Sequence, residues 1–261
     1  MNIYNKNNII KQCLAEFFGT GLIILFGLNA TVLSKLSNYN INYLDISIIW
    51  SIGVSISIYS SLFISGAHLN PAITIFLWSI SEFNKKKVLP YIFSQILGSF
   101  FFTMIIYCIY RNILIVFERT HKIVRGTQES LDLASIFCVY PKINTLFLYD
   151  FIAEVMTSII FMIVIMLLRH KKKYLLTYSY LSPILVGILI FFINISIGSY
   201  YNITLNPARD IGPRVFLSFI GWGSLSFTGG TNIPYFFIPL LGPIIGINIG
   251  GWLYKKLIIK N

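Results

Sequence analysis

Twice in this apolar chain the tripeptide Asn-Pro-Ala occurs, first in Ser65-Gly66-Ala67-His68-Leu69-Asn70-Pro71-Ala72 and again in Ile203-Thr204-Leu205-Asn206-Pro207-Ala208-Arg209-Asp210. Asn is a favoured helix N-cap, and Pro suits the first helical position because its missing N–H is not needed there. Each tripeptide therefore predicts the start of a short helix, over about 71–80 and about 207–219. A single Asn-Pro-Ala could equally mark an ordinary capped helix in a loop. Two of them, 136 residues apart (Asn70 to Asn206), at matching places in two apolar halves, indicate a repeated architecture.

The composition excludes a water-soluble domain. Of 261 residues, 56% are hydrophobic and only 11% are charged, whereas a soluble domain of this size needs far more charge on its surface. The net charge of +11 comes from short basic clusters between apolar runs, so we expect no nucleic-acid partner. Three cysteines, an odd number, show no disulfide framework and no metal-ligand spacing, and we expect no metal and no cofactor.

Six apolar segments have the length of about 20 residues that crosses the hydrocarbon of a lipid bilayer. They cover about 10–34, 44–64, 88–110, 146–168, 179–200 and 233–254. The two short helices that begin at Pro71 and Pro207 rise only about 15 Å, half of a bilayer, so they must be re-entrant. The predicted fold is an all-α membrane protein with six transmembrane helices plus two re-entrant half-helices.

The basic residues of the loops predict the orientation. One side carries Lys6, Lys11, Lys85, Lys86, Lys87, Arg169, Lys171, Lys172, Lys173, Lys255, Lys256 and Lys260. The other side carries Lys35, Arg111, Arg119, Lys122, Arg125 and Lys142. The positive charge of that side is partly offset by Glu118, Glu129, Asp132 and Asp150. Because cytoplasmic loops hold the excess of Lys and Arg, both termini are predicted to be cytoplasmic.

The two halves repeat one another. Ala15-Glu16-Phe17 in the first half corresponds to Ala153-Glu154-Val155 in the second, and both third spans begin with Pro-Tyr, at Pro90 and Pro234. We expect a single membrane domain over 1–261, with a first repeat over about 10–111, a second over about 146–256 and an extracellular loop over 112–145. Three spans plus one half-helix form each repeat, so the second copy is inverted in the membrane. Such inverted repeats place a functional site at the bilayer midplane.

These motifs resemble those of the aquaporin superfamily, specifically its aquaglyceroporin branch, over nearly the full length of the chain. The resemblance rests on Ala15 to Gly21, Ser65 to Ala72, Phe117 to Gly126, Asn206 to Pro213 and Phe227 to Gly230, and Asp210 after Arg209 is typical of the glycerol-conducting branch. It implies a homotetramer with one pore per subunit in the lipid bilayer of a bacterial inner (plasma) membrane. The implied solutes are glycerol, small polyols and water, and a cytoplasmic glycerol kinase is an implied functional partner.

Four side chains are candidates for the conduction path. Asn70 and Asn206 can each cap a half-helix with the side-chain oxygen while the amide NH2 faces the lumen; the alternative is capping alone. Arg209 lies about 4.5 Å further along the second half-helix, where a charge in a membrane indicates function. Trp50 lies near the outer end of the second span and would offer an apolar wall opposite these donors. For Trp50 the competing interpretation is a place in the interfacial aromatic belt.

The sequence departs from the family at the expected selectivity filter. A filter Phe of the family falls on Ile203, a Gly on Asn194, another Gly on Asn202 and an Ala on Thr204. Loss of the Phe removes half of an aromatic corner, while the two asparagines add bulk and hydrogen-bonding groups. We expect conduction to be retained with weakened glycerol selectivity, and a pore mainly for water or urea stays an alternative.

Glu16 and Glu154 are carboxylates inside spans. They are expected to accept hydrogen bonds from backbone N–H groups of the re-entrant loops, which otherwise lack partners. His68 is expected to pack in its loop, with gating by protonation as the alternative. In the family, backbone carbonyls at the positions of Gly66, Ala67, His68 and Leu69, and of residues 202–205, line the pore, so Asn202 and Thr204 belong to this set.

A passive pore is the leading class of function. A proton-coupled transporter shares inverted repeats and broken helices and would use Glu16 or Glu154 for coupling. An ion channel is disfavoured because no ring of carboxylates is visible and Arg209 repels cations. An enzyme is disfavoured because no nucleophile and base occur together in the sequence.

Overall fold

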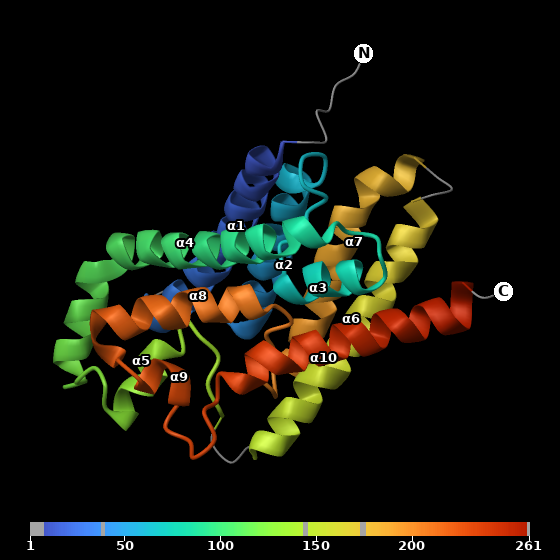
Figure 1. Cartoon of the computed structure of the whole chain (residues 1–261). Helices are drawn as coiled ribbons and strands as arrows, with labels where there is room; N and C mark the ends of the chain where they lie inside the picture. The colour runs from blue at the N-terminus through green and yellow to red at the C-terminus, as the bar shows by residue number, and fades with distance from the viewer. Residues whose placement is uncertain (1–7, 38–39, 143–145, 173–175, 260–261) are drawn as a thin grey trace.

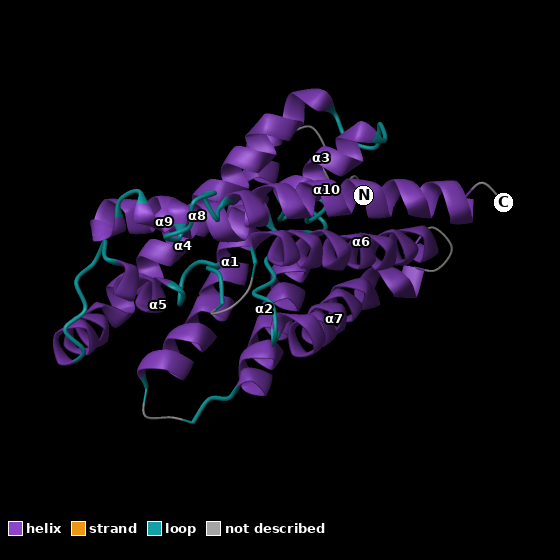
Figure 2. Cartoon of the chain, turned by 90° about the horizontal axis from the view of Figure 1, so that it is seen from below, coloured by secondary structure: helices purple, strands orange, loops and turns teal. Residues whose placement is uncertain are grey.

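The computed structural model describes residues 8–37, 40–142, 146–172 and 176–259. Lys6, Lys173 and Lys260 of the charge pattern lie outside these residues. The described residues are helical, with loops and no strand (Figure 2). The long helices are α1 (Ile9–Leu36), α2 (Tyr43–Ser61), α4 (Lys85–Thr120), α6 (Phe147–Lys172), α7 (Leu176–Ile193) and α10 (Phe237–Tyr254). These correspond to the six expected spans, and each is long and apolar enough to cross a membrane.

The short elements complete the chain. The two half-helices are α3 (Pro71–Ser79) and α8 (Pro207–Leu217). The segment before α6 contains η1 (Gln128–Ser130) and α5 (Leu131–Ala134), and α9 (Leu225–Thr228) precedes α10. Wider turns follow three of the helices, at η2 (Asn194–Gly198), η3 (Ser218–Trp222) and η4 (Lys255–Ile259). Within η3 the backbone is kinked at Ile220 and Gly221.

Asparagine side chains start five of the helices. Asn8, Asn42, Asn70, Asn84 and Asn206 are N-caps, and the side-chain oxygen of each accepts a hydrogen bond from a backbone N–H of the first turn. Such caps satisfy donors that an α-helix cannot satisfy by itself. In both half-helices, proline occupies the first position after the cap, as the two Asn-Pro-Ala stretches predict.

The third span is longer than the expected segment of about 88–110. Helix α4 continues to Thr120 (Figure 1), so the first residues of the expected 112–145 loop are helical. Arg111, Glu118 and Arg119 lower the hydropathy there, but a helix that leaves the hydrocarbon does not need to stay apolar. Leu114 is buried in a core cluster with residues of α1 and of the 131–140 segment, and this contact holds the extra turns in place. The last span begins at Phe237 rather than at about 233.

The half-helices interlock the two halves of the chain. Helix α3, from the first half, packs beside α10, the last span of the second half, and α8 packs beside α4 (Figure 1). Within each half the first span lies against the third, α1 on α4 and α6 on α10. The architecture is therefore the inverted repeat that the sequence predicts, with each half-helix held largely by the opposite half.

Several polar side chains are buried, and many large apolar side chains are exposed on the outer surface. Glu16, Gln95 and Arg214 are fully buried, whereas Leu89 on α4 is 77% exposed. A water-soluble protein rarely exposes so many large apolar side chains, so this surface is suited to lipid.

Glycines bring the paired spans into close contact. A Cβ at Gly98 of α4 would stand 2.9 Å from the Phe17 carbonyl carbon of α1, and a Cβ at Gly246 of α10 would stand 2.6 Å from Ser158 Cβ of α6. We predict that Gly98→Ala and Gly246→Ala each destabilise the protein by about 1–3 kcal/mol, because the helices must separate. Thermal unfolding in detergent measures this. Leu89→Ala, on the outer face, is the control, and an unchanged unfolding temperature in both glycine variants would contradict the prediction.

Candidate functional site: a cavity at the junction of two half-helices

The side chains of Asn70 and Asn206 join the N-termini of the two half-helices. Asn70 Oδ1 accepts a hydrogen bond from Ala72 N at 2.9 Å, and Asn70 Nδ2 donates to the carbonyl of Leu205 at 2.8 Å. Asn206 does the same in reverse, accepting from Ala208 N at 3.0 Å and donating to the carbonyl of Leu69 at 2.7 Å. An amide NH2 has two N–H groups, so each asparagine keeps a second donor beyond this link.

The loops that lead into the half-helices have an unusual backbone. Ala67, Leu69 and Leu205 have φ angles of 51°, 49° and 58°, in the left-handed region that side chains other than glycine rarely adopt. Such a conformation costs on the order of 1–3 kcal/mol for each residue and persists only where the surroundings hold it. The neighbouring carboxylates supply that support.

Glu16 and Glu154 bind these loops through backbone amides. Glu16 accepts from His68 N at 2.9 Å and from Leu69 N at 2.6 Å. Glu154 accepts from Thr204 N at 2.8 Å and from Leu205 N at 2.6 Å. Hydrogen bonds to a charged acceptor are the strong ones, and both carboxylates are buried. Neither lines the cavity described below; each lies behind its loop.

The first loop has additional side-chain support. Glu16 also accepts from Ser65 Oγ at 2.6 Å and from Gln95 Nε2 at 2.7 Å. The His68 ring packs in the loop, with Nδ1 3.2 Å from Thr74 Oγ1. Its ring centroid lies 4.6 Å from that of Phe83 and 5.2 Å from that of Tyr91.

A cavity of about 340 Å³ follows the interface between the two halves. One face of α2 lines it at helical spacing, from Tyr43 through Trp50 to Leu62 just beyond the helix, and these 19 steps correspond to a rise of about 30 Å. That length is about the hydrocarbon thickness of a bilayer. The cavity lining includes all the filter and loop positions expected from the sequence, which are Trp50, Gly66, Ala67, His68, Leu69, Asn70, Asn194, Asn202, Ile203, Thr204, Asn206 and Arg209.

Trp50 and Arg209 face each other in this cavity. The guanidinium carbon of Arg209 lies 4.9 Å from the centroid of the Trp50 ring, within cation–π range. The ring itself packs against Gly27 of α1, where a Cβ would clash with it. Arg209 Nη1 donates to the carbonyl of Phe137 at 3.1 Å, which leaves other donors of the guanidinium for the cavity.

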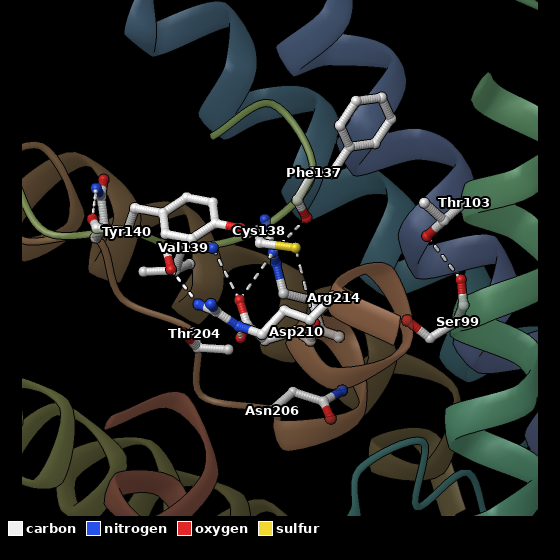
Figure 3. Close-up of polar contacts among 12 residues, drawn as sticks. Ser99, Thr103, Phe137, Cys138, Val139, Tyr140, Thr204, Asn206, Asp210 and Arg214 are labelled. Carbon is white, nitrogen blue, oxygen red and sulfur yellow. Dashed lines mark hydrogen bonds and ion pairs between the residues drawn. The ribbon is translucent and has the colours of Figure 1, made fainter. Parts of the chain in front are cut away.

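A buried ion pair, which the sequence analysis missed, fixes the segment around Arg209 (Figure 3). Asp210 and Arg214, four residues apart on α8, are both fully buried and paired. Asp210 Oδ1 accepts from Val139 N at 2.8 Å, while Arg214 donates to the carbonyls of Val139 and Ser226. The pair thus ties the 137–140 segment to the half-helix. Two opposite charges at i and i+4 inside a re-entrant helix were the sequence signal for it.

Of the four positions that the sequence analysis expects to depart from the family, one has a side chain that is turned partly away from the cavity. Asn202 Nδ2 donates to the carbonyl of Tyr140 at 2.9 Å, so this asparagine serves the loop contact as well as the lining. Ile203 packs against the core cluster that contains Phe161 and Met162. Asn194 is the first residue of η2. Thr204 is buried, and its backbone N–H donates to Glu154.

The fold and this site define a channel-type membrane protein. The chain matches the family described as Major intrinsic protein over residues 4–254, and it belongs to this family. Together with the six apolar helices, this makes it a multi-pass membrane protein.

Individual relatives are similar over nearly the whole chain. The glycerol uptake facilitator protein of Buchnera aphidicola subsp. Acyrthosiphon pisum is 56% identical over 260 residues, with 99% of each chain covered. The glycerol uptake facilitator protein of Escherichia coli (strain K12) is 44% identical, covering 96% of this chain and 89% of the relative. Among solved structures, the aquaglyceroporin from Plasmodium falciparum aligns with a TM-score of 0.82 at 28% identity, covering 97% of this chain and 98% of that one.

The buried pair should be sensitive to loss of one charge. We predict that Asp210→Asn, which keeps the shape of the side chain, destabilises the protein by about 3–5 kcal/mol because Arg214 is left as an uncompensated buried charge. The matched control is Asp132→Asn, which breaks the exposed pair with Lys35 and should cost at most about 1 kcal/mol. Thermal unfolding in detergent compares the two. Equal unfolding temperatures would show that the buried pair has no such role.

Proposed function

We propose that the chain is a passive channel for glycerol and related small neutral solutes, with some water, in a bacterial inner membrane. The single observation that carries this proposal is the cavity that passes both the Asn70–Asn206 junction and the Trp50–Arg209 pair. The relatives named as glycerol uptake facilitators support glycerol as the solute. Both termini are proposed to be cytoplasmic, from the Lys and Arg distribution.

The junction is proposed to exclude protons and cations. Unpaired N–H groups and aligned peptide dipoles place partial positive charge at the N-termini of α3 and α8. The second N–H of Asn70 and of Asn206 adds donors at the same depth. A passing hydroxyl or water turns its lone pairs toward these donors, while cations meet positive potential. Aquaporin-type pores use half-helix dipoles or an Arg as such a barrier.

Trp50 and Arg209 are proposed to form the narrow filter. The guanidinium provides a planar fork of donors that can hold two neighbouring hydroxyls, and the indole provides an apolar surface for the carbon edge of a polyol. Asn194 and Ile203 complete the filter. Ile203 in place of an aromatic ring is proposed to weaken glycerol selectivity, and a pore mainly for water or urea is the second candidate.

The carboxylates argue against a proton-coupled transporter. Each oxygen of Glu16 and Glu154 already accepts a hydrogen bond from a loop amide, so protonation would remove support from the strained loops. This favours a structural role over a coupling role. The wider proposal, from the family resemblance, includes a homotetramer with one pore per subunit and functional coupling to a cytoplasmic glycerol kinase.

Stopped-flow light scattering on proteoliposomes tests the proposed function. After a jump into glycerol, vesicles containing the protein should shrink and then re-swell much faster than protein-free vesicles, whereas sucrose should give shrinkage alone. The rate should not respond to an imposed pH gradient. Absence of accelerated glycerol influx, or uphill accumulation driven by protons, would contradict the channel.

Restoring the family residues tests the filter. We predict that the combined variant Asn194→Gly, Asn202→Gly, Ile203→Phe and Thr204→Ala raises the ratio of glycerol to water permeability, because an aromatic wall returns opposite Arg209. Trp50→Ala should lower the same ratio by removing the remaining wall. Trp78→Ala is the control, since Trp78 is exposed and lies outside the cavity lining. If neither filter variant changes the ratio, these residues do not select the solute.

A further inference from the structure

The stretch Phe117 to Gly126, on which the family resemblance partly rests, forms a clamp outside the cavity. The Arg125 guanidinium binds both oxygens of Glu118, with Nε 2.6 Å from Oε1 and Nη2 3.2 Å from Oε2. Its Nη1 also donates to the Tyr107 hydroxyl at 3.1 Å and to the carbonyl of Ile220 at 2.7 Å. A two-pronged contact between a guanidinium and a carboxylate is both strong and specific in its geometry.

The Glu118–Arg125 clamp holds the kink that follows α8. Ile220 and Gly221 form this kink within η3, and Gly221 has a φ angle of 118°, which residues other than glycine rarely adopt. The Arg125 side chain packs on the glycine, since a Cβ at Gly221 would stand 3.2 Å from Arg125 Cδ. The guanidinium carbon also lies 4.8 Å from the ring centroid of Trp222, the next residue. One side chain therefore joins the end of α4 to the end of α8.

Trp222 continues the contact toward the cavity wall. Its indole Nε1 donates to the carbonyl of Ser130 at 3.2 Å, and its ring belongs to the same buried cluster as Phe137. The carbonyl of Phe137 accepts from Arg209 Nη1 at 3.1 Å. A continuous series of contacts thus leads from the clamp to the guanidinium of the proposed filter.

The clamp itself lies away from the solute. Neither Glu118 nor Arg125 is among the described residues that line the cavity. Such a clamp has two possible roles. It can stabilise the outer end of the fold and nothing else, which changes how many channels are folded. It can also hold the carbonyl that orients Arg209, which changes the solutes that each folded channel passes.

We propose that the Glu118–Arg125 clamp positions the Arg209 guanidinium for polyol selection. It acts through Trp222 and the carbonyl of Phe137, so Arg125 is a positioning residue. This inference rests on the proposed glycerol channel and adds a determinant of its selectivity outside the pore. Glycerol needs two donors held in one orientation for two neighbouring hydroxyls, whereas water needs only one. A loosened guanidinium therefore impairs glycerol passage more than water passage.

Stopped-flow light scattering gives the glycerol and water permeabilities of the same proteoliposomes, and their ratio does not depend on how many channels are folded. Arg125→Met keeps most of the side-chain stem and removes the guanidinium, and Glu118→Gln keeps the shape and removes the charge. Each should lower the glycerol-to-water ratio roughly two- to tenfold, as expected for loss of one hydrogen bond. The double variant should show less than the product of the two effects, because both changes break the same clamp.

Arg209→Ala tests the route of the effect. Without this guanidinium there is nothing left to position. Adding Arg125→Met to Arg209→Ala should therefore leave the ratio at the value that Arg209→Ala alone gives. A further fall in the ratio would mean that the clamp acts on the solute by another route, which contradicts the proposal.

Gly246→Ala is the control for destabilisation alone. It disturbs the contact between α6 and α10, so it should lower the unfolding temperature without changing the ratio. Clamp variants that also unfold at lower temperature but keep the ratio would overturn the positioning role and leave the channel intact. If Arg125→Met does not fold, the ratio of Glu118→Gln decides in the same way. No glycerol flux in the unsubstituted protein would instead overturn the proposed function itself.

Discussion

The reciprocal hydrogen bonds of Asn70 and Asn206 are the interaction on which the rest of the structure depends. Each asparagine caps its own half-helix and donates to the carbonyl just before the other asparagine. This brings two helix N-termini, which would repel each other as like partial charges, into one junction. The loops behind them adopt left-handed backbone at Leu69 and Leu205, and Glu16 and Glu154 hold that backbone through its amides.

The position of the proposed filter follows from the same junction. Because α8 begins at the Asn206 cap, Arg209 lies one turn away, and the Asp210–Arg214 pair fixes its neighbourhood by binding the 137–140 segment. Helix α8 of the second half packs beside α4 of the first half (Figure 1). The proposed filter is likewise assembled from both halves, because Trp50 lies on α2 and Arg209 on α8. The guanidinium then faces Trp50 of α2. A displaced cap would therefore move the proposed filter as well as the junction.

Local rules account for what the sequence predicts well. Capping preferences predict the half-helices, and the length of the apolar segments predicts the six spans. Because backbone amides in the loops need acceptors, the sequence also predicts the contacts of Glu16 and Glu154. The remainder depends on contacts between distant residues. The hydrogen bond between Asp210 and Val139 joins residues that are 71 positions apart. The hydrogen bond between Asn202 and Tyr140 joins residues that are 62 positions apart. The hydropathy pattern also placed the end of α4 too early, because α4 continues to Thr120. The extra turns are stabilised by the packing of Leu114 in a buried cluster, which hydropathy does not reveal.

The most direct test of the central claim is the proton and sodium leak of proteoliposomes, measured together with glycerol flux, for the unsubstituted protein and for Asn206→Asp. Aspartate still caps α8 but replaces the amide donors with negative charge. The account predicts glycerol flux without a leak above protein-free vesicles in the unsubstituted protein, and a clear cation leak in Asn206→Asp. A leak that rises with glycerol flux in the unsubstituted protein, or an Asn206→Asp variant as tight as its parent, would contradict it.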